Sequence, residues 1–398
     1  MKEQNKRPAL YLAPGKEKAV MRRHPWIFSG AVKRRVGDFH EGDIIDVYSA
    51  DGTWLAAGHF QDESIICKVL SFDTPDVDPD THPEFWQDRV RQAVAYRRRL
   101  GFFDIPDTNV FRLVHAEGDF LPGLVADYYN GVLVLQAHSV GMHRVFPLLT
   151  KLFAEELPLK SIFDKSSSTI PGGGVADGYI WGEEPEEWEI TEYGNKLLIN
   201  FFEGQKTGFF VDQRENRRLV GSLSEGRRVL NCFGYTGGFS LGALRGGASY
   251  VETVDISKKA IELCNRNVAL NFGEDASHKG VVADVLQYLD TVSDQFDVII
   301  LDPPAFAKSH RNLQQGLKGY RNINQKAMEK IRPGGLLFTF SCSQAVSRDD
   351  FQTMCFTAAA NAHRKVRIVR QLPHAMDHPV SIYHPEGEYL KGLLLYVE

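Results

Sequence analysis

The C-terminal half of the chain alternates short apolar runs with longer amphipathic segments. Short apolar runs are typical of parallel strands that are buried on both faces, and the segments between them have helical spacing. The predicted strands are 229–233, 250–255, 279–283, 297–301 and 336–341, and the predicted helices are 240–245, 258–271, 284–291 and 319–331. This alternation predicts an α/β, doubly wound, Rossmann-like domain over 199–398, whose ligands bind beyond the carboxyl ends of the strands.

The N-terminal half has a different pattern, in which short strands are separated by turn signals. Asp51-Gly52 is a hairpin signal between two alternating segments, and residues 1–76 are predicted to form a small β-rich domain. A stretch rich in Pro and Asp, 73–83, predicts a linker. Residues 77–198 are predicted to form a central α+β domain, with helices at 85–100 and 141–156 and strands at 110–116, 124–129, 132–138, 161–163 and 178–181.

Composition narrows the class of protein further. The 398 residues are 43% hydrophobic and 24% charged, which is typical of globular domains and not of disordered or fibrous chains. No run of about 18 apolar residues is present, so no transmembrane helix is predicted, and residues 1–12 lack the apolar segment of a signal peptide. The five cysteines are scattered without a C-x-x-C pair, which predicts reduced thiols in the cytoplasm and neither disulfides nor a zinc site.

Charge is unevenly distributed along the chain. The formal net charge of −5 excludes a uniformly basic surface, yet residues 1–35 carry ten Lys and Arg against two Glu. Lys and Arg contribute most of the affinity for RNA through its phosphates, so this stretch is a candidate RNA-binding face. His374, His378 and His384 match no standard zinc spacing. No metal site is predicted from them, and their region is interpreted as the hairpin that closes the sheet.

Polar residues gather where the predicted strands of the C-terminal domain end. The first strand runs into a glycine-rich turn, 231–240, which fits a dinucleotide-binding fingerprint poorly and by itself is equally typical of a tight strand-to-helix turn. Asp255 ends the second strand, where a carboxylate can accept the hydroxyl protons of a ribose, and Asp284 follows the third, placed for an adenine amine. Asp302 follows the fourth strand. A single acid of this kind is usually a helix cap, but the four strand ends together favour a ligand-binding edge.

This combination resembles a class I S-adenosylmethionine-dependent methyltransferase. Three strings narrow the resemblance: Lys-Thr-Gly-Phe-Phe-Val-Asp-Gln-Arg at 206–214, Asp-Pro-Pro-Ala-Phe at 302–306 and Ser-Cys-Ser at 341–343. With Tyr-Leu-Lys-Gly at 389–392, they are similar to strings of the bacterial large-subunit rRNA cytosine-5 methyltransferases that carry an N-terminal PUA domain. The resemblance extends over nearly the whole chain. It implies that residues 1–76 are a PUA domain, an RNA-binding β-barrel, and that the partners are large-subunit rRNA and S-adenosylmethionine.

The resemblance also implies a set of cofactor and substrate contacts. The implied cofactor-binding residues are Lys206, Thr207, Gly208, Asn231, Phe233, Gly234, Tyr235, Thr236, Gly237, Asp255, Ile256, Asp284 and Asp302. The implied substrate contacts are Pro303, Pro304 and Phe306. The two prolines stiffen the loop that they occupy, and Phe306 is expected to stack on a base that has been extruded from its neighbours.

Within this resemblance, Cys342 is the predicted nucleophile. C5 of cytosine becomes nucleophilic when a thiolate adds to C6, and cysteine is the side chain with appreciable thiolate character near neutral pH. Cys342 follows an apolar strand that is predicted to lie beside the strand ending at Asp302, and Asp302 is predicted to hydrogen-bond or protonate N3 of the ring. Cys232 is the competing candidate, but its position beside the glycine turn favours packing. No cysteine follows Pro304, so the group that assists product release is unassigned. The base that removes the C5 proton is unassigned as well.

Other functions stay open from the sequence. Asp-Pro-Pro-aromatic strings also hold nitrogen atoms of purines for methylation, and that chemistry needs no thiol. A PUA protein that binds RNA or assists ribosome assembly without catalysis is the alternative of another class. A nicotinamide dehydrogenase is disfavoured by the glycine spacing. The sequence determines neither the target nucleotide, nor whether free rRNA or an assembled subunit is modified, nor the oligomeric state, a homodimer included.

Overall fold

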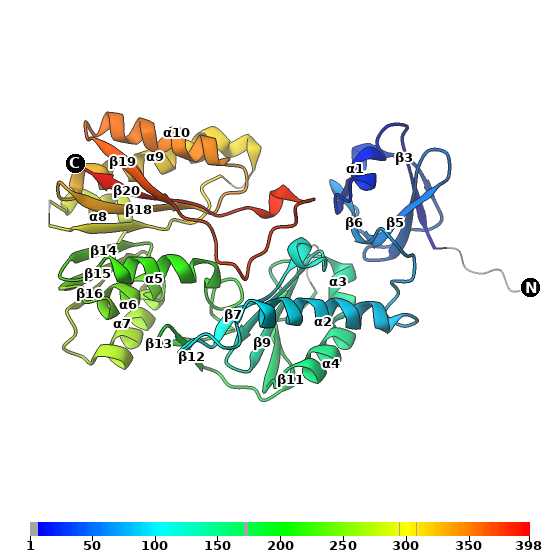
Figure 1. The fold of residues 1–398 in the computed structure, drawn as a ribbon, viewed down its shortest axis with the longest axis horizontal. Helices are drawn as coiled ribbons and strands as arrows, with labels where there is room; N and C mark the ends of the chain where they lie inside the picture. Colours follow the sequence, from blue (N-terminus) through cyan, green and yellow to red (C-terminus); the bar gives the residue numbers. More distant parts are fainter. Residues whose placement is uncertain (1–6, 171–173, 294, 308) are drawn as a thin grey trace, which may run out of the picture. The chain divides into compact units, whose positions relative to one another are not determined.

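The computed structural model describes residues 7–170, 174–293, 295–307 and 309–398 (Figure 1). It divides into two compact units, each built from separate stretches of the chain. The first unit comprises 1–190, 199–211 and 376–387, and the second comprises 191–198, 212–375 and 388–398. The basic stretch predicted to bind RNA belongs to the first unit, and its residues 1–6 lie outside the described residues.

The first unit begins with a six-stranded, mostly antiparallel sheet. Its strands are β1 (Ala9–Leu12), β2 (Trp26–Phe28), β3 (Val32–Val36), β4 (Ile44–Tyr48), β5 (Trp54–Phe60) and β6 (Ile65–Ser71), in the order β2-β6-β5-β4-β1-β3, with α1 (Lys18–Met21) after β1. Ile45 and Val47 of β4 are buried in its core, as the period of a half-buried strand requires. The predicted hairpin at Asp51-Gly52 connects β4 with β5, and Gly52 supplies the positive φ of 93°.

A five-stranded sheet with helices follows in the same unit. Its strands are β7 (Val110–His115), β8 (Leu124–Tyr129), β9 (Val132–Ala137), β10 (Ser161–Asp164) and β11 (Gly178–Gly182), in the order β11-β10-β9-β8-β7, and its helices are α2 (Pro83–Arg99), α3 (Val140–Arg144) and α4 (Phe146–Glu156). The hairpin between β8 and β9 turns at Asn130 and Gly131. Their φ values of 48° and 94° are both positive, as a two-residue type I′ turn requires.

The helix predicted over 141–156 is two helices. α3 ends at Arg144, and α4 begins at Phe146 with Pro147 in its first turn. Proline lacks an N–H group and its ring clashes with the carbonyl four residues earlier, so it is suited to the start of a helix and interrupts the interior of one. The apolar residues continue across the break, which is why periodicity alone joins the two segments.

The second unit is an α/β domain with a seven-stranded sheet. Its strands are β14 (Arg228–Cys232), β15 (Tyr250–Asp255), β16 (His278–Val282), β17 (Val298–Leu301), β18 (Gly335–Ser341), β19 (Val366–Gln371) and β20 (Lys391–Val397), in the order β16-β15-β14-β17-β18-β20-β19. β14 to β18 are parallel, and β20 is antiparallel to both of its neighbours. The predicted Rossmann-like domain is confirmed, and the antiparallel β20 distinguishes its sheet from the dinucleotide-binding order.

Helices cover both faces of this sheet (Figure 1). They are α5 (Arg214–Ser222), α6 (Gly238–Arg245), α7 (Lys258–Phe272), α8 (Val285–Thr291), α9 (Leu313–Lys330) and α10 (Arg348–Asn361). Successive residues of a strand point to opposite faces of the sheet. Leu230 therefore packs with α8, α9 and α10, whereas Val229 packs with α5 and α6. Chain order reverses between β14 and β17, so their carboxyl ends form the crevice in which such sheets bind ligands.

The remaining elements are short. A hairpin of β12 (Trp188–Glu192) and β13 (Asn195–Ile199) precedes the second unit's helices. Turns of 3₁₀ helix occur at η1 (Ser29–Ala31), η2 (Ala116–Asp119), η3 (Val211–Gln213), η4 (His310–Asn312) and η5 (Pro385–Gly387). Among the helices of the described residues, none has both the length and the apolar character of a membrane span.

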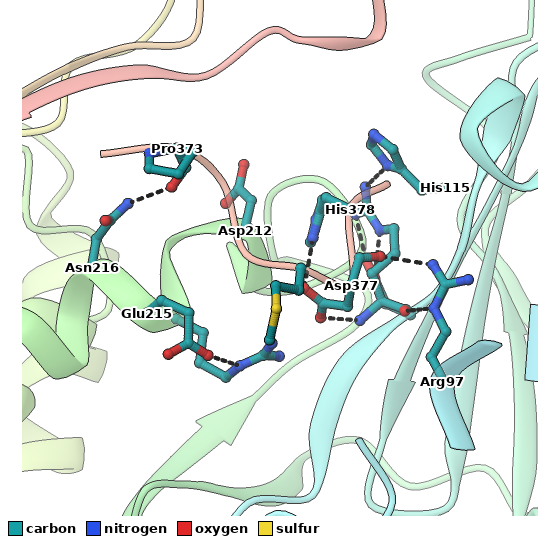
Figure 2. A network of polar contacts seen from close by, with 12 residues as sticks. Arg97, His115, Asp212, Glu215, Asn216, Pro373, Asp377 and His378 are labelled. Carbon is teal, nitrogen blue, oxygen red and sulfur yellow. Dashed lines mark hydrogen bonds and ion pairs between the residues drawn. The ribbon is translucent and has the colours of Figure 1, made fainter. Parts of the chain in front are cut away.

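Residues 376–387, in the connection between β19 and β20, form a strap that belongs to the first unit. Nη2 of Arg97 donates to the carbonyl oxygen of Asp377 at 2.7 Å, and the backbone N–H of Arg112 donates to the Asp377 carboxylate at 2.8 Å (Figure 2). Arg97 is fully buried and also pairs with Asp119. The division into units does not test the predicted domain limits at 76 and 198. The first unit does contain two stretches of the predicted 199–398 domain, namely 199–211 and the strap.

Candidate active site

The turn between β14 and α6 is strained in a way that a simple connection does not require. Phe233 and Tyr235 have positive φ values of 58° and 45°, although neither is glycine. A left-handed residue that carries a Cβ costs roughly 1–2 kcal/mol, and strain of this kind concentrates at ligand sites. The turn therefore has the character of a binding loop, beyond that of a tight strand-to-helix connection.

Two glycines let this turn lie close to β15 and to α7. A Cβ on Gly234 would lie 2.3 Å from Cγ2 of Thr253, and a Cβ on Gly237 would lie 2.5 Å from Sγ of Cys264. Gly237 also has a φ of 85°, which glycine adopts without strain. A side chain at either position would push the turn away from β15 or α7.

Asn231 supports the turn through a chain of side-chain hydrogen bonds. Its Nδ2 donates to Oγ of Ser240 at 2.9 Å, the Ser240 hydroxyl bonds with Oγ1 of Thr253 at 2.6 Å, and Thr253 bonds with Nε2 of His278 at 2.7 Å. Asn231 is 1% exposed, and burial lowers the pKa of His278 to about 4, so the imidazole is neutral. The structure therefore gives the Asn231 side chain a supporting position under the turn, and its contact with a cofactor stays a prediction.

One carboxylate ends β15 and another follows β16, as predicted. Asp255 accepts hydrogen bonds from the backbone N–H of Tyr235 at 3.0 Å and of Ser257 at 2.8 Å, so it ties the glycine turn to the start of α7. Ile256, the next residue, is 74% exposed. Asp284 is the N-cap of α8 and accepts from the N–H of Gln287 at 3.0 Å. Both acids stabilise local structure, and each retains lone pairs for a hydroxyl or amine of a ligand.

Asp302, which follows β17, is a carboxyl group with a raised pKa. Burial raises its pKa to about 7 and the charge of Asp212 adds to the effect, while a hydrogen bond from Gln213 and the charge of Arg217 act in the opposite direction. Nε2 of Gln213 donates to Oδ1 of Asp302 at 3.1 Å, and Nδ2 of Asn216 holds Gln213 by donating to its Oε1 at 2.6 Å. Near neutral pH both protonation states of Asp302 are populated, which suits a general acid or base.

Asp212 is itself held in a defined position. The Tyr389 hydroxyl donates to its Oδ2 at 2.6 Å, and its backbone carbonyl accepts from the N–H of Ala375 at 3.1 Å. The other carboxylate oxygen, Oδ1, is buried and has no hydrogen-bond partner among the described residues. Asp212 therefore adds a fixed negative charge near Asp302.

Cys342 differs from the other four cysteines in its exposure. It is partly exposed just after β18, whereas Cys67, Cys232, Cys264 and Cys355 are buried. Burial raises the pKa of the Cys264 and Cys355 thiols to about 12 and raises that of the Cys67 and Cys232 thiols as well. Because the thiolate is the reactive form, Cys342 is the best placed of the five to act as a nucleophile near neutral pH.

Tyr320 of α9 joins the Asp-Pro-Pro loop to the turn that carries Cys342. Its hydroxyl bonds with Oγ of Ser343 at 2.8 Å, and its ring centroid lies 4.7 Å from that of Phe306. Sγ of Cys342 lies 4.0 Å from the carbonyl oxygen of Pro303. The structure thus brings the predicted nucleophile and the predicted substrate-contacting loop to neighbouring strand ends.

The predicted cofactor contacts at 206–208 belong to the first unit, so the geometry of the second unit does not test them. The Thr207 hydroxyl donates to Oδ2 of Asp127 at 2.5 Å and bonds with the hydroxyl of Tyr129 at 2.9 Å. Thr207 is buried, and its side chain is therefore committed to the interior of the first unit. Lys206 is exposed, with a positive φ of 56°.

Sequence reasoning missed the two tyrosines that organise this edge. Tyr320 lies in the middle of a helix, where nothing in its neighbours distinguishes it from a core residue. Tyr389 had a usable signal, because it begins the Tyr-Leu-Lys-Gly string that contributed to the resemblance. Within the described residues, no group of three His, Cys, Asp or Glu side chains is placed to hold a metal ion.

A doubly wound sheet with a strained glycine turn and acids after consecutive strands defines an S-adenosylmethionine-dependent methyltransferase. A family model described as S-adenosylmethionine-dependent methyltransferase matches residues 173–380, and a model of a PUA-like domain matches residues 10–72. Both matches confirm the predicted class, its cofactor and the nature of the N-terminal domain.

Curated relatives identify the family more closely. The ribosomal RNA large subunit methyltransferase I of Serratia proteamaculans is 40% identical over 96% of this chain and 98% of its own length. The proteins of the same name from Aeromonas hydrophila and Cronobacter sakazakii are 39% and 40% identical over 97% and 98% of this chain, and over 98% and 99% of theirs. The chain therefore belongs to the ribosomal RNA large subunit methyltransferase I family, as the resemblance predicted.

Solved structures agree on the fold. A Streptococcus mutans protein described as a SAM-dependent methyltransferase superposes with a TM-score of 0.83 at 20% identity, over 98% of this chain and 100% of that one. SMU.776, described as a methyltransferase complexed with SAH, superposes with a TM-score of 0.84 at 20% identity, with the same coverage of both chains. At this level of identity the likeness shows the shared fold.

Proposed function

We propose that this methyltransferase forms 5-methylcytosine in large-subunit rRNA, with Cys342 as nucleophile and Asp302 as proton donor. The observation that carries the proposal is the partly exposed Cys342 thiol beside the Asp-Pro-Pro loop. Methylation of a nitrogen needs no thiol, whereas activation of C5 of cytosine does. The names of the relatives support rRNA as the substrate, with the cytoplasm as its location, and the PUA-like domain supports an RNA partner.

The ends of β14, β15 and β16 offer the groups that an adenosine-type cofactor needs. Asp255 can accept the hydroxyl hydrogens of the ribose, Asp284 the amine of the adenine, and the exposed Ile256 provides apolar surface for the ring. The backbone of 233–237 completes this edge. When bound, S-adenosylmethionine supplies an electrophilic methyl group on its sulfonium. Contacts from 206–208 are carried by the resemblance alone.

The residues that follow β17 and β18 activate the base. The Cys342 thiolate forms a bond to C6 of cytosine, the electrons of the C5–C6 double bond move toward C4, and N3 takes the proton of the Asp302 carboxyl group. C5 is then the nucleophilic carbon of an enamine. C5 forms a bond to the methyl carbon as the bond from that carbon to the sulfonium sulfur breaks. A base, for which water is available, then takes the C5 proton, the C5–C6 double bond re-forms as the C6–S bond breaks, and Asp302 recovers its proton from N3.

Asp302 has the properties that this proton transfer requires. A carboxyl group with a pKa of about 7 is protonated in a substantial fraction of molecules at neutral pH, whereas an ordinary aspartate is almost fully ionised. Gln213 fixes its orientation through the 3.1 Å hydrogen bond. Pro303 and Pro304 stiffen the backbone that follows Asp302. The ring of Phe306 packs against that of Tyr320 and is proposed to stack on the extruded base.

The test combines unmodified large-subunit rRNA, S-adenosylmethionine with a deuterated methyl group, and mass spectrometry of the nucleosides. The wild type is expected to form labelled 5-methylcytidine, and Cys342→Ala is expected to form none. Cys355→Ala is the matched control, because it removes a buried thiol of α10 by the same chemical change and should leave the product intact.

Two outcomes would contradict the proposal. A labelled N-methyl purine that survives Cys342→Ala would place the enzyme among the nitrogen methyltransferases. Binding of rRNA and of S-adenosylmethionine by the wild type, with no label transferred to free rRNA or to assembled subunits, would favour a non-catalytic RNA-binding role.

A further inference from the structure

Lys391 is a buried lysine at the start of β20, directly across from the end of the strand that leads to Cys342. In the antiparallel pair β18–β20, Ser341 stands opposite Lys391, and Cys342 is the residue after Ser341. Lys391 is 5% exposed. Its Nζ donates to the carbonyl oxygen of Ser343 at 2.6 Å and to that of Tyr389 at 2.7 Å. The ammonium is thus bonded to the backbone of Ser343, which follows Cys342, whereas Ser341, which pairs with Lys391 across the sheet, precedes Cys342.

The charge of this lysine lacks the compensation that buried charges normally have. Buried ammonium groups are usually paired with a carboxylate, because neutral carbonyls alone replace their hydration poorly. Within the described residues Lys391 forms no ion pair with a carboxylate, and its recorded partners are the two carbonyl oxygens. The negative charge of Glu388 raises the pKa of Lys391 without an ion pair between them, and Glu388 is itself paired with Arg348.

Electrostatics connects Lys391 with Cys342. Burial lowers the pKa of Lys391 to about 8, and a negative charge on Cys342 raises that pKa, as does Glu388, while Arg348 lowers it. The hydroxyl of Tyr320 also faces this turn, but burial raises its pKa, so it stays neutral. An interaction between two charges is mutual: a thiolate that favours the ammonium is favoured by it to the same extent.

We propose that Lys391 is a positioning residue for the nucleophile: its backbone-anchored ammonium supplies the positive charge that stabilises the Cys342 thiolate in the resting enzyme. This inference rests on the proposed function, in which Cys342 attacks cytosine. It explains why a lysine is buried where an uncharged donor would satisfy the same two carbonyls. It also assigns a role to the Tyr-Leu-Lys-Gly string at 389–392, whose Tyr389 holds Asp212 while its Lys391 faces the thiol turn.

The test measures the reactivity of the Cys342 thiol with iodoacetamide as a function of pH, by mass spectrometry of the peptide that contains it. It needs neither RNA nor cofactor. In Lys391→Met the midpoint of alkylation is expected to rise by about one pH unit, so that the rate at pH 7 falls about tenfold while the plateau at high pH is unchanged. Lys391→Arg, which keeps the charge, should have a midpoint closer to that of the wild type.

Arg367→Met is the matched control, because it removes an exposed cation near the other end of β20, where Arg367 stands opposite Tyr396. Its alkylation profile should coincide with that of the wild type. A midpoint in Lys391→Met equal to the wild-type value would overturn the inference and leave Lys391 a purely structural residue. A uniform change of rate at all pH values would do the same.

A reciprocal measurement covers the case in which Lys391→Met does not fold. Competitive labelling of lysines with acetic anhydride reports the titration of Lys391 in the wild type and in Cys342→Ala. Removal of the thiol is expected to lower the midpoint of Lys391, and an unchanged midpoint would overturn the inference. Failure of the proposed function has a separate signature, namely methylation that survives Cys342→Ala.

Discussion

The two halves of the sheet edge in the second unit are built by different means. At the ends of β14, β15 and β16, the distinguishing contacts are made with the main chain: Asp255 accepts from two backbone N–H groups, and Asp284 caps α8. After β17 and β18, side chains contact other side chains in the pairs Gln213–Asp302 and Tyr320–Ser343, and at the start of β20 the Lys391 side chain donates to two carbonyl oxygens. The contacts of the first half fix the conformation of the backbone, and those of the second half influence the protonation of side chains such as Asp302.

This difference predicts that the two halves can be damaged separately. A change at the side-chain half should abolish chemistry and leave cofactor affinity intact, because the backbone contacts of Asp255 and Asp284 do not involve its residues. A change at the main-chain half should weaken cofactor binding and leave the reactivity of the thiol intact. We call them the chemistry edge (ends of β17, β18 and β20) and the cofactor edge (ends of β14, β15 and β16).

The largest effect is expected from Asp302→Asn at the chemistry edge. The amide can still accept the Gln213 hydrogen bond but cannot give a proton to N3, so the rate of methyl transfer should fall by roughly 10²–10⁴-fold. Affinity for S-adenosylmethionine, measured by titration calorimetry, should change by less than about threefold. A large loss of cofactor affinity would show that Asp302 belongs to the cofactor edge and would remove the distinction drawn here.

A smaller effect is expected from Gly234→Ala at the cofactor edge. The added Cβ would lie 2.3 Å from Cγ2 of Thr253, and overpacking of this kind costs about 1–3 kcal/mol. Cofactor affinity should therefore fall about tenfold, while alkylation of Cys342 at pH 7 should be unaffected.

Thr253→Ser provides a matched rescue of that variant. It removes the methyl group that the new Cβ meets and keeps the hydroxyl that bonds with Ser240 and His278. The double variant should regain part of the lost affinity, whereas Thr253→Ser alone should bind the cofactor normally. Absence of any rescue would mean that the turn is not seated on Thr253.

The smallest effect concerns stability and pH. The pKa of Asp302 is raised from 3.8 to about 7 in the folded protein, so the unfolded chain loses its proton first, and stability falls as pH rises through that range. Asp302→Asn cannot ionise and escapes this loss. Its melting temperature relative to the wild type should increase between pH 5 and pH 8 by roughly 2–8 °C, which corresponds to about 1–2 kcal/mol after allowance for partial solvent exposure.

Asp297→Asn is the control for this trend. Burial acts to raise the pKa of Asp297, but hydrogen bonds from the backbone N–H of Arg228 and from Arg332 outweigh it, and the pKa is lowered below 3.8. Asp297 is therefore ionised in both the folded and the unfolded chain from pH 5 to pH 8. The difference in melting temperature between this variant and the wild type should be constant over that range.

The cofactor edge could be predicted from the sequence because its determinants are local. A glycine-rich turn, or an acid at the end of an apolar strand, is recognisable from about ten consecutive residues, and parallel strands bring such ends together by topology. Even there the hydrogen bond from Asn231 to Ser240 was not predicted, because the sequence does not tell which face of a strand end is covered. The helix break at Pro147 was missed for a related reason, since the apolar pattern runs through it.

The chemistry edge was predictable only in part. Cys342 and Asp302 were found through strand position and resemblance, but the partners that adjust them come from distant parts of the chain. Gln213 is 89 residues from Asp302 in sequence, and Lys391 is 48 residues from Ser343. No periodicity or local motif encodes such pairs, because they depend on the packing of whole layers.

The strap has a consequence for the synthesis of the protein. Asp377 accepts from Arg97, which precedes it by 280 residues, and from the backbone of Arg112. At a translation rate of 5–20 residues per second, the ribosome makes this partner roughly 15–60 s after Arg97. During that interval the first unit exists as a nascent intermediate whose buried guanidinium lacks one of its acceptors. The N-terminal unit is therefore completed only after most of the second unit, residues 212–375, has been translated.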